Sequence, residues 1–222
     1  MSSKIVLYGI DMSPCVRTVQ LTLKALELPY EYKEVNLQKG EHLSEEFLKK
    51  NPQHTVPVLD DDGTILWDSH AIVGYLVDKY GKSDELYPKD LAKRAAINQR
   101  LFFDASVLFP SLANVSRPFW VNGVKEVPQE KLDTIHTGLK LLEAFLGSSN
   151  YLVGDTLTLA DLCCGPTVTS LPAAVDIDSA EYPKVTAWLE RLNKVAYFEQ
   201  INKSPAKSYC DFLRSQWTKL GA

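Results

Sequence analysis

The chain lacks any long hydrophobic run. Its first apolar stretch, Ile5–Tyr8, is soon interrupted by Gly9 and Asp11 and is shorter than the apolar core of a signal peptide. No later run approaches the roughly 20 apolar residues that a helix needs to cross a bilayer. We therefore expect a cytoplasmic protein with no membrane partner.

Positive charge is not in excess either. The 222 residues include 24 Lys and Arg against 28 Asp and Glu, which gives a net charge of −4 at pH 7, and the basic residues form no long cluster. Proteins that hold the phosphate backbone of a nucleic acid usually carry a basic patch. This balance argues against a nucleic-acid partner.

Cysteine is scarce and scattered. Cys15, Cys163, Cys164 and Cys210 have neither the spacing of a disulfide framework nor that of a cysteine metal site, so we expect reduced thiols. Internal repeats and low-complexity segments are absent from the sequence. The length is enough for two modest globular domains.

A strand followed by a helix opens the chain. The run Ile5–Tyr8 fits a buried strand, Gly9–Met12 fits a turn, and the pair Ser13-Pro14 suits the start of a helix. Apolar residues then recur at helical spacing, at Val16, Val19, Leu23 and Leu26. A hydroxyl group is thus predicted where the positive end of a helix would face a bound anion.

A second strand and a short helix follow. Alternating apolar and polar residues favour a strand over Tyr30–Asn36, and a polar loop, Leu37–Glu41, comes after it. Ser44 then precedes a helix over 45–50, in which Phe47 and Leu48 are expected to face inward.

A hairpin is predicted next. The pair Val58-Leu59 indicates a strand, and Pro57 before it suits a strand start or a cis peptide bond. The turn signal Asp60–Gly63 joins this strand to another at Ile65–Trp67.

A third helix completes the first part of the chain. The pair Asp68-Ser69 opens it and Gly81 ends it, so the order of elements up to this point is βαβαββα. The polar segment 82–90 contains Pro88 and suits a linker.

Only helical patterns follow residue 90. They cover residues 92–121, 129–146, 185–195 and 207–217. Pro110 and Pro118 should kink or break the first of these helices. Before the third, the Asp161 carboxylate can accept a hydrogen bond from the N–H of Thr158, which is a capping arrangement that starts one more helix.

Three separated segments carry a resemblance to a known family. They read YGIDMSPCVRTV, NPQHTVPVLDDDGTILWDSHAI and TLTLADL. With the mixed first half and the helical second half, they resemble the cytosolic glutathione transferases over essentially the whole chain, and most of all the insect delta and epsilon classes. The run NPQHTVP together with DSHAI favours the epsilon class.

The resemblance implies an α/β, thioredoxin-like N-terminal domain over residues 1–81 that binds glutathione. A linker at 82–90 and an all-α domain over 91–222 are implied to follow, the latter forming most of the pocket for an electrophile. A homodimer is implied as well. The implied activity is transfer of the glutathione thiolate to small hydrophobic electrophiles, with glutathione as cosubstrate and no metal.

Other activities stay open at this point. The same site could support glutathione-dependent peroxide reduction or the elimination of HCl from chlorinated compounds. A non-catalytic carrier of hydrophobic ligands, or a scaffold dimer, is the main alternative. Such proteins often lose the hydroxyl group that activates the thiol, whereas Ser13 is present here.

Ser13 is the catalytic residue that the resemblance implies. A free thiol has a pKa of about 8.5, so only a few per cent is thiolate at pH 7. A hydroxyl group that donates to the sulfur, beside the positive end of a helix, favours the charged form. A serine at this place is by itself more often a plain helix cap, and the other motifs favour the catalytic role.

Cys15 offers a different chemistry. Redox relatives of the thioredoxin fold place a cysteine directly before the proline, where this chain has Ser13. Because Cys15 follows the proline, we interpret it as a packed apolar residue. A thiol–disulfide oxidoreductase that uses Cys15 is the alternative.

The resemblance implies a glutathione site with contacts along the tripeptide. If Pro57 is cis, as implied, the N–H and C=O of Val56 form a strand edge that an extended peptide can pair with. Asp68 suits the γ-glutamyl ammonium, although relatives often carry Glu there, and Ser69 suits its carboxylate. The other implied contacts are His42, His54, Thr55 and His70.

Zinc is the competing interpretation of the histidines. His42, His54 and His70 are 12 and 16 residues apart, which matches no compact ligand motif, so we predict no metal. His136 lies in a helical pattern and is assigned no role.

The acceptor pocket is implied to be largely apolar. Its residues are Leu37, Phe109, Leu112, Ala113, Ser116, Phe119, Tyr209 and Phe212. The alternative for such a set is that a helix rich in phenylalanine is simply core. Some epsilon relatives carry an arginine near Ala113, and its absence indicates a roomier, less polar pocket. The alternative is that Arg117, one turn later, compensates for it.

Overall fold

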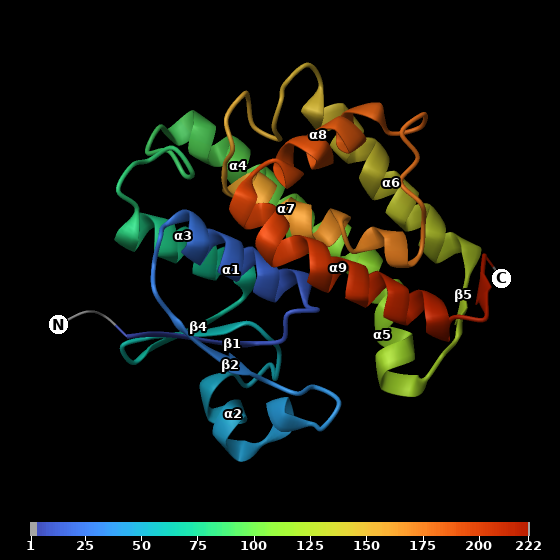
Figure 1. The fold of residues 1–222 in the computed structure, drawn as a ribbon, viewed down its shortest axis with the longest axis horizontal. Coiled ribbons are helices and arrows are strands. Elements are labelled where there is room, and N and C mark those ends of the chain that lie inside the picture. The colour runs from blue at the N-terminus through green and yellow to red at the C-terminus, as the bar shows by residue number, and fades with distance from the viewer. Residues whose placement is uncertain (1–3, 222) are drawn as a thin grey trace.

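The computed structural model describes residues 4–221 (Figure 1). Residues 1–3 and 222, the outermost residues of the two expected domains, lie outside the described residues. A small sheet with its covering helices occupies one end of the molecule, and the helices α4 to α9 form the other (Figure 1).

The first part of the chain has the predicted order βαβαββα. Its elements are β1 Ile5–Gly9, α1 Pro14–Ala25, β2 Glu31–Glu34, α2 Glu45–Lys50, β3 Val58–Asp61, β4 Thr64–Trp67 and α3 Ser69–Tyr80. One 3₁₀ turn, Glu41–Leu43, follows the predicted loop. The strand order is β2-β1-β3-β4, with β1 and β2 parallel and the other pairs antiparallel.

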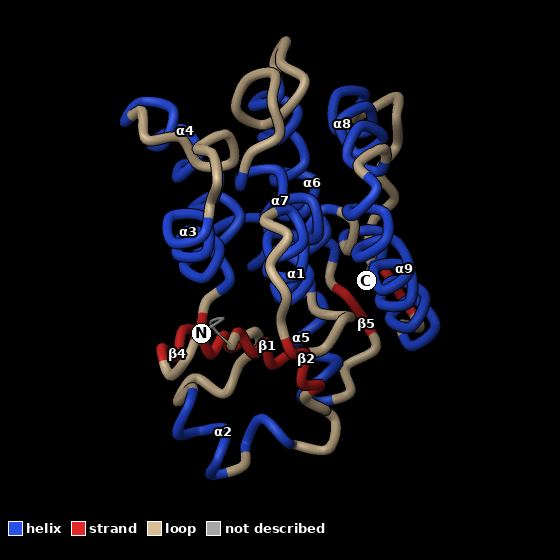
Figure 2. The backbone as a smooth tube through the Cα atoms, turned by 60° about the vertical axis from the view of Figure 1, so that its left-hand side comes forward, coloured by secondary structure: helices blue, strands red, loops and turns tan. Residues whose placement is uncertain are grey.

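The sheet separates two layers of helices. Figure 2 shows α1 and α3 on one face and α2 on the other. Adjacent residues of a strand point to opposite faces, so Leu59 packs with Leu7 in the main core while Val58 packs with Phe47 beneath α2.

The prediction that Leu48 faces inward is wrong, because its side chain is 36% exposed while that of Phe47 is only 6% exposed. Successive helical residues are about 100° apart, and a helix this short turns only one side to the sheet.

The second part of the chain consists mainly of helices. They are α4 Leu91–Phe103, α5 Phe109–Asn122, α6 Gln129–Leu146, α7 Leu159–Val168, α8 Pro183–Asn193 and α9 Ala196–Gln216. A π-helical turn, Asp104–Leu108, joins α4 to α5 just before Pro110, where an interruption was predicted. Among the described residues, no helix is long and apolar enough to span a membrane.

Helix α5 continues through Pro118 without a break. The expected start of the last helix at Lys207 is wrong, because α9 begins at Ala196 and continues through Pro205. A proline inside a helix costs about 3 kcal/mol. Phe198, which is fully buried in the first turn of α9, shows how packing of the earlier turns offsets this cost.

Helix α7 lies at the centre of the helical part, and all of its residues are buried. The predicted capping contact is present, because the Asp161 carboxylate accepts a hydrogen bond from the N–H of Thr158 at 2.9 Å. The same carboxylate accepts from the N–H of Leu152 and from Nε1 of Trp188, each at 2.9 Å. Burial raises the pKa of Asp161.

A short pair of strands was not predicted. Strand β5, Glu126–Val127, pairs in parallel with β6, Lys219–Leu220, and so ties the end of the chain to the connection between α5 and α6. Two-residue strands are too short to show any periodicity in the sequence.

Candidate active site

Strand register gathers the predicted site at one edge of the sheet. Tyr8 pairs with Val58 and Val58 pairs with Trp67. The chain segments beyond this row therefore lie at the same edge. They are the turn that leads from β1 to Ser13, the segment before β3 that contains Val56, and the turn that leads from β4 to Asp68.

Ser13 lies at the N-terminus of α1, as predicted. Its Oγ accepts a hydrogen bond from the N–H of Val16 at 3.4 Å, which is long for such a bond. Within residues 4–221 no group accepts the Ser13 hydroxyl proton, which is free to be donated to a ligand. Gly9 lets the strand approach the helix, because a Cβ at that position would lie 2.7 Å from both Cγ atoms of Val16.

The segment before β3 presents unpaired backbone groups. The Val56–Pro57 peptide bond is cis, as the resemblance implies. Neither the N–H nor the C=O of Val56 is hydrogen-bonded to another group in the described part of the chain. Asn51, fully buried, fixes the segment by donating from Nδ2 to the carbonyl oxygen of Thr55 at 2.9 Å and to its Oγ1 at 3.0 Å.

Asp68 caps α3 from an unusual backbone conformation. Its φ of 71° and ψ of 116° lie outside the regions that non-glycine residues normally occupy. Its Oδ1 accepts from the N–H of His70 at 2.9 Å and from that of Ala71 at 3.2 Å. Hydrogen bonding from His70 lowers the pKa of Asp68. Strained backbone of this kind concentrates at functional sites.

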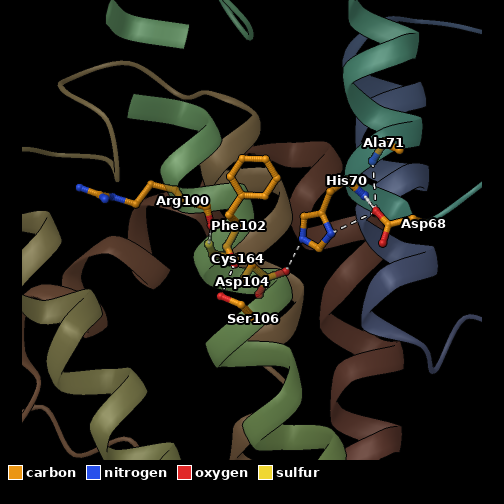
Figure 3. Close-up of polar contacts among 8 residues, drawn as sticks. All are labelled: Asp68, His70, Ala71, Arg100, Phe102, Asp104, Ser106 and Cys164. Carbon is orange, nitrogen blue, oxygen red and sulfur yellow. Dashed lines mark hydrogen bonds and ion pairs between the residues drawn. The ribbon is translucent and has the colours of Figure 1, made fainter. Parts of the chain in front are cut away.

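His70 lies between two carboxylates (Figure 3). Its Nε2 is 2.9 Å from Oδ2 of Asp104, and its Nδ1 is 3.5 Å from Oδ1 of Asp68. Burial alone lowers the pKa of His70, but the two carboxylates, Asp104 first, outweigh burial and raise it to about 9. The imidazole of His70 is therefore positively charged at pH 7 and connects α3 to the helical half of the molecule.

Asp104 is a site residue that the sequence reasoning missed. It lies in the π-helical turn between α4 and α5, and its side chain is 5% exposed. It is 34 residues from His70, and no local pattern connects the two positions.

His42, in the 3₁₀ turn Glu41–Leu43, lies close to His54, with ring centroids 6.1 Å apart. Burial, and then the charge of His54, lowers the pKa of His42, which is neutral at pH 7. Nδ1 of His42 is buried and has no hydrogen-bond partner among residues 4–221. In the same described range, no group of three or more His, Cys, Asp and Glu side chains is placed to hold a metal ion.

Cys15 is poorly suited to thiol chemistry. Burial, followed by the charge of Asp104, raises the pKa of its thiol to about 12. A nucleophilic cysteine needs the opposite shift, because the thiolate is the reactive form. Cys163 and Cys164 are fully buried in α7.

The predicted acceptor residues divide into buried and accessible ones. Leu112, Ser116 and Tyr209 are buried, and the Ser116 hydroxyl donates to the Leu112 carbonyl at 2.9 Å. The half-buried members are Leu37, Phe109, Ala113, Phe119 and Phe212. A cavity of about 440 Å³ lies elsewhere, between the end of α1 and residues 82–86, and no predicted site residue lines it.

An aromatic cluster joins the ends of α5 and α9. The rings of Phe119 and Phe212 are 5.9 Å apart. Trp120, which sequence reasoning missed, stacks on Phe212 at 5.1 Å with an angle of 9° between the planes. The sequence signal that could have indicated Trp120 is its position directly after Phe119, near the end of the same helix.

Family models match both parts of the chain. One described as "Glutathione S-transferase, N-terminal domain" matches residues 7–84, and one described as "Glutathione S-transferase, C-terminal domain" matches residues 96–195. Glutathione S-transferase 1 of Manduca sexta is 45% identical over 208 residues, which are 92% of this chain and 94% of that protein.

Solved structures agree over nearly the whole chain. An epsilon-class glutathione S-transferase from the housefly, Musca domestica, has a TM-score of 0.94 and 51% identity, and the match covers 96% of this chain and 98% of that one. A glutathione transferase homologue from Drosophila mojavensis, with bound glutathione, has a TM-score of 0.95 and 46% identity, and the match covers 98% of this chain and all of that one. The chain therefore belongs to the glutathione S-transferase family and is similar to insect members of its epsilon class.

Proposed function

We propose that this protein transfers the thiolate of glutathione to small hydrophobic electrophiles and that Ser13 holds the sulfur in its ionised form. The observation that carries the proposal is the Ser13 hydroxyl group, which stands at the N-terminus of α1 with its proton free for donation. A hydrogen bond to sulfur and the positive end of the helix both favour the thiolate. Each unit by which the thiol pKa is lowered in this way corresponds to about 1.4 kcal/mol of stabilisation of the thiolate relative to the thiol.

In this proposal glutathione lies along the edge of the sheet. Asp68 pairs with the γ-glutamyl ammonium, and Ser69 with the backbone amides at the start of α3 binds the carboxylate beside it. The free N–H and C=O of Val56 pair with the peptide backbone of the ligand, as an added strand would. His42 and His54 face the glycyl end.

In this proposal the protein itself forms no covalent bond during the chemical step. The thiol proton leaves to solvent, and the sulfur attacks the electrophile, either displacing a leaving group or adding to a conjugated double bond. The rate comes from the higher thiolate fraction and from the alignment of the two reactants in a dry pocket. We assign glutathione binding to residues 1–81 and most of the acceptor pocket to residues 91–222, in a cytoplasmic homodimer.

Ser13→Ala tests the proposal. With a chromogenic aromatic electrophile, we expect kcat/KM to fall by about a hundredfold, which is typical of losing one donor to a developing anion. Glutathione should still bind, because its other contacts remain.

Ser44→Ala is the matched control, because Ser44 caps α2 as Ser13 caps α1, with Oγ accepting from the N–H of Phe47 at 3.3 Å. Its activity should stay within about twofold of wild type, since loss of a cap costs only about 1 kcal/mol of stability. Full activity in Ser13→Ala would contradict the proposal. Glutathione binding without conjugation of any electrophile by the wild type would favour the carrier instead.

A further inference from the structure

A buried cation lies one helical turn from Ser13. Arg17 belongs to α1 and is fully buried, and its backbone N–H donates to the carbonyl oxygen of Ser13 at 3.1 Å. Side chains of an α-helix lean toward its N-terminus, so the Arg17 side chain extends from its own turn toward the turn that begins at Ser13.

The hydrogen-bond partners of this cation are all neutral. Nη1 donates to Oδ1 of Asn202 in α9. Nη2 donates to Oγ of Ser170 at 2.6 Å and approaches the carbonyl oxygen of Pro166 at 3.5 Å. Nε has no partner, and within residues 4–221 no carboxylate lies at ion-pair distance from Arg17.

A buried guanidinium without a carboxylate is an unfavourable arrangement. Burial lowers the pKa of Arg17 to about 10, so the group is still charged at pH 7. The carbonyl end of α7 near Pro166 offsets part of the charge through the helix dipole.

Among residues 4–221, the titratable groups that face Arg17 do not supply a buried counter-charge. Burial raises the pKa values of Cys15, Tyr209 and Cys210, all of which are neutral at pH 7. Asp11, in the loop before α1, is exposed and accepts a hydrogen bond from Nε2 of Gln20 at 2.9 Å. A negative charge from outside the described part of the chain is therefore expected.

We infer that the bound thiolate at Ser13 is the counter-charge of Arg17, and that Arg17 stabilises the ionised sulfur through space without touching it. This inference rests on the proposed function. The charge of Arg17 also acts on the thiol nearest to Ser13 in the chain: burial and then the charge of Asp104 raise the pKa of Cys15, and Arg17 lowers it by a smaller amount. A fixed charge in a site closed to water acts more strongly than one in solvent.

The direct test is an ultraviolet titration of glutathione bound to the full-length protein. Arg17→Gln removes the charge and should raise the pKa of the bound thiol by about one unit, which is about tenfold less thiolate at a pH below both values. Arg17→Lys, which keeps the charge, should restore part of the shift. A thiol pKa unchanged in Arg17→Gln would overturn the inference.

A second variant keeps the test valid if Arg17→Gln does not fold. Asn202→Asp places a carboxylate at the guanidinium and so neutralises the buried charge while preserving the contact. It should fold and should also raise the pKa of the bound thiol. Asn202→Ala is the matched control, because it removes a partner but leaves the charge, and should lower the melting temperature without changing the thiol pKa.

Affinities separate an electrostatic role from a structural one. Near pH 8, Arg17→Gln or Asn202→Asp should weaken glutathione binding several-fold and leave binding of S-methylglutathione, which has no ionisable thiol, unchanged. Equal weakening of both ligands would show a structural role only. If the wild type itself leaves the bound thiol protonated, the proposed function fails. If the bound thiol is ionised in the wild type and equally ionised in the variants, this inference fails and the proposed function stands.

Discussion

The two ends of the proposed glutathione site are built differently. At one end, Asp68 is held by the backbone of α3 and by His70, which is in turn held by the buried Asp104 from the other half of the molecule. At the other end, His42 and His54 face each other at 6.1 Å, and Nδ1 of His42 has no partner in the described range. We propose that the first end is organised before the ligand arrives, whereas the second is completed by it.

This difference predicts which property each substitution affects. Residues at the Asp68 end connect the two halves of the fold, so changing them should reduce stability and ligand affinity together. Residues at the histidine end belong to loops of the first half alone, so changing them should reduce affinity and leave stability nearly unchanged. The predictions below run from the largest expected effect to the smallest.

His70→Ala should have the largest effect. It leaves the Asp104 carboxylate buried without its close cationic partner, and breaking a buried ion pair in this way costs about 4 kcal/mol of unfolding free energy. Urea denaturation measures the loss. His136→Ala is the control, because within residues 4–221 the His136 side chain is hydrogen-bonded only to the neutral Tyr182 hydroxyl group, at 2.8 Å, and it should lose about 1 kcal/mol. Equal losses in the two variants would contradict the distinction between the ends.

The contribution of His70 should also depend on pH. Its pKa rises from 6.5 to about 9 on folding, so its stabilisation is fully present below pH 6.5 and is lost as the pH rises through 9. The difference in unfolding free energy between wild type and His70→Gln should therefore shrink by about 3 kcal/mol between these limits. A difference that stays constant over this range would show that His70 is not charged in the folded protein.

Asp68→Asn should reduce glutathione affinity about thirtyfold, or about 2 kcal/mol. Asparagine caps helices and tolerates a positive φ, so the substitution removes the charge while keeping the backbone conformation. Calorimetric titration with glutathione measures the loss. An analogue without the γ-glutamyl ammonium should bind both proteins equally, and an unchanged affinity for glutathione itself would remove Asp68 from the site.

His54→Asn should have the smallest effect. Asparagine suits the φ of 48° at this position, and the loss of one exposed contact should lower glutathione affinity by about 1 kcal/mol, roughly fivefold. The unfolding free energy should change by less than about 0.5 kcal/mol, since His54 is exposed. A clear loss of stability would mean that this end is also organised before the ligand binds.

What could be predicted from the sequence was local. Ser13-Pro14 and Asp68-Ser69 start helices because of their own side chains and those of the next few residues. The capping contact of Asp161 with Thr158 is local in the same way. Assigning Ser13, Asp68 and Ser69 to one glutathione site required the resemblance, which spans all three segments.

What could not be predicted was non-local. Asp104 meets His70 across 34 residues, and Arg17 meets Asn202 across 185. Periodicity shows which face of a helix is apolar, but it does not show which polar residue of another element will lie against that face. Helix α9 begins at Ala196, eleven residues before the predicted start at residue 207, and it includes Pro205, which local propensity disfavours inside a helix and tertiary packing tolerates.

The ionisation of glutathione at Ser13 is the central claim of this account. The ultraviolet thiolate absorbance of glutathione bound at pH 7, compared between wild type and Ser13→Ala, measures it directly. We expect a strong thiolate band in the wild type and a much weaker one in the variant, in which only the positive end of α1 and the charge of Arg17 still favour the thiolate. Equal thiolate bands in the two proteins would contradict the claim.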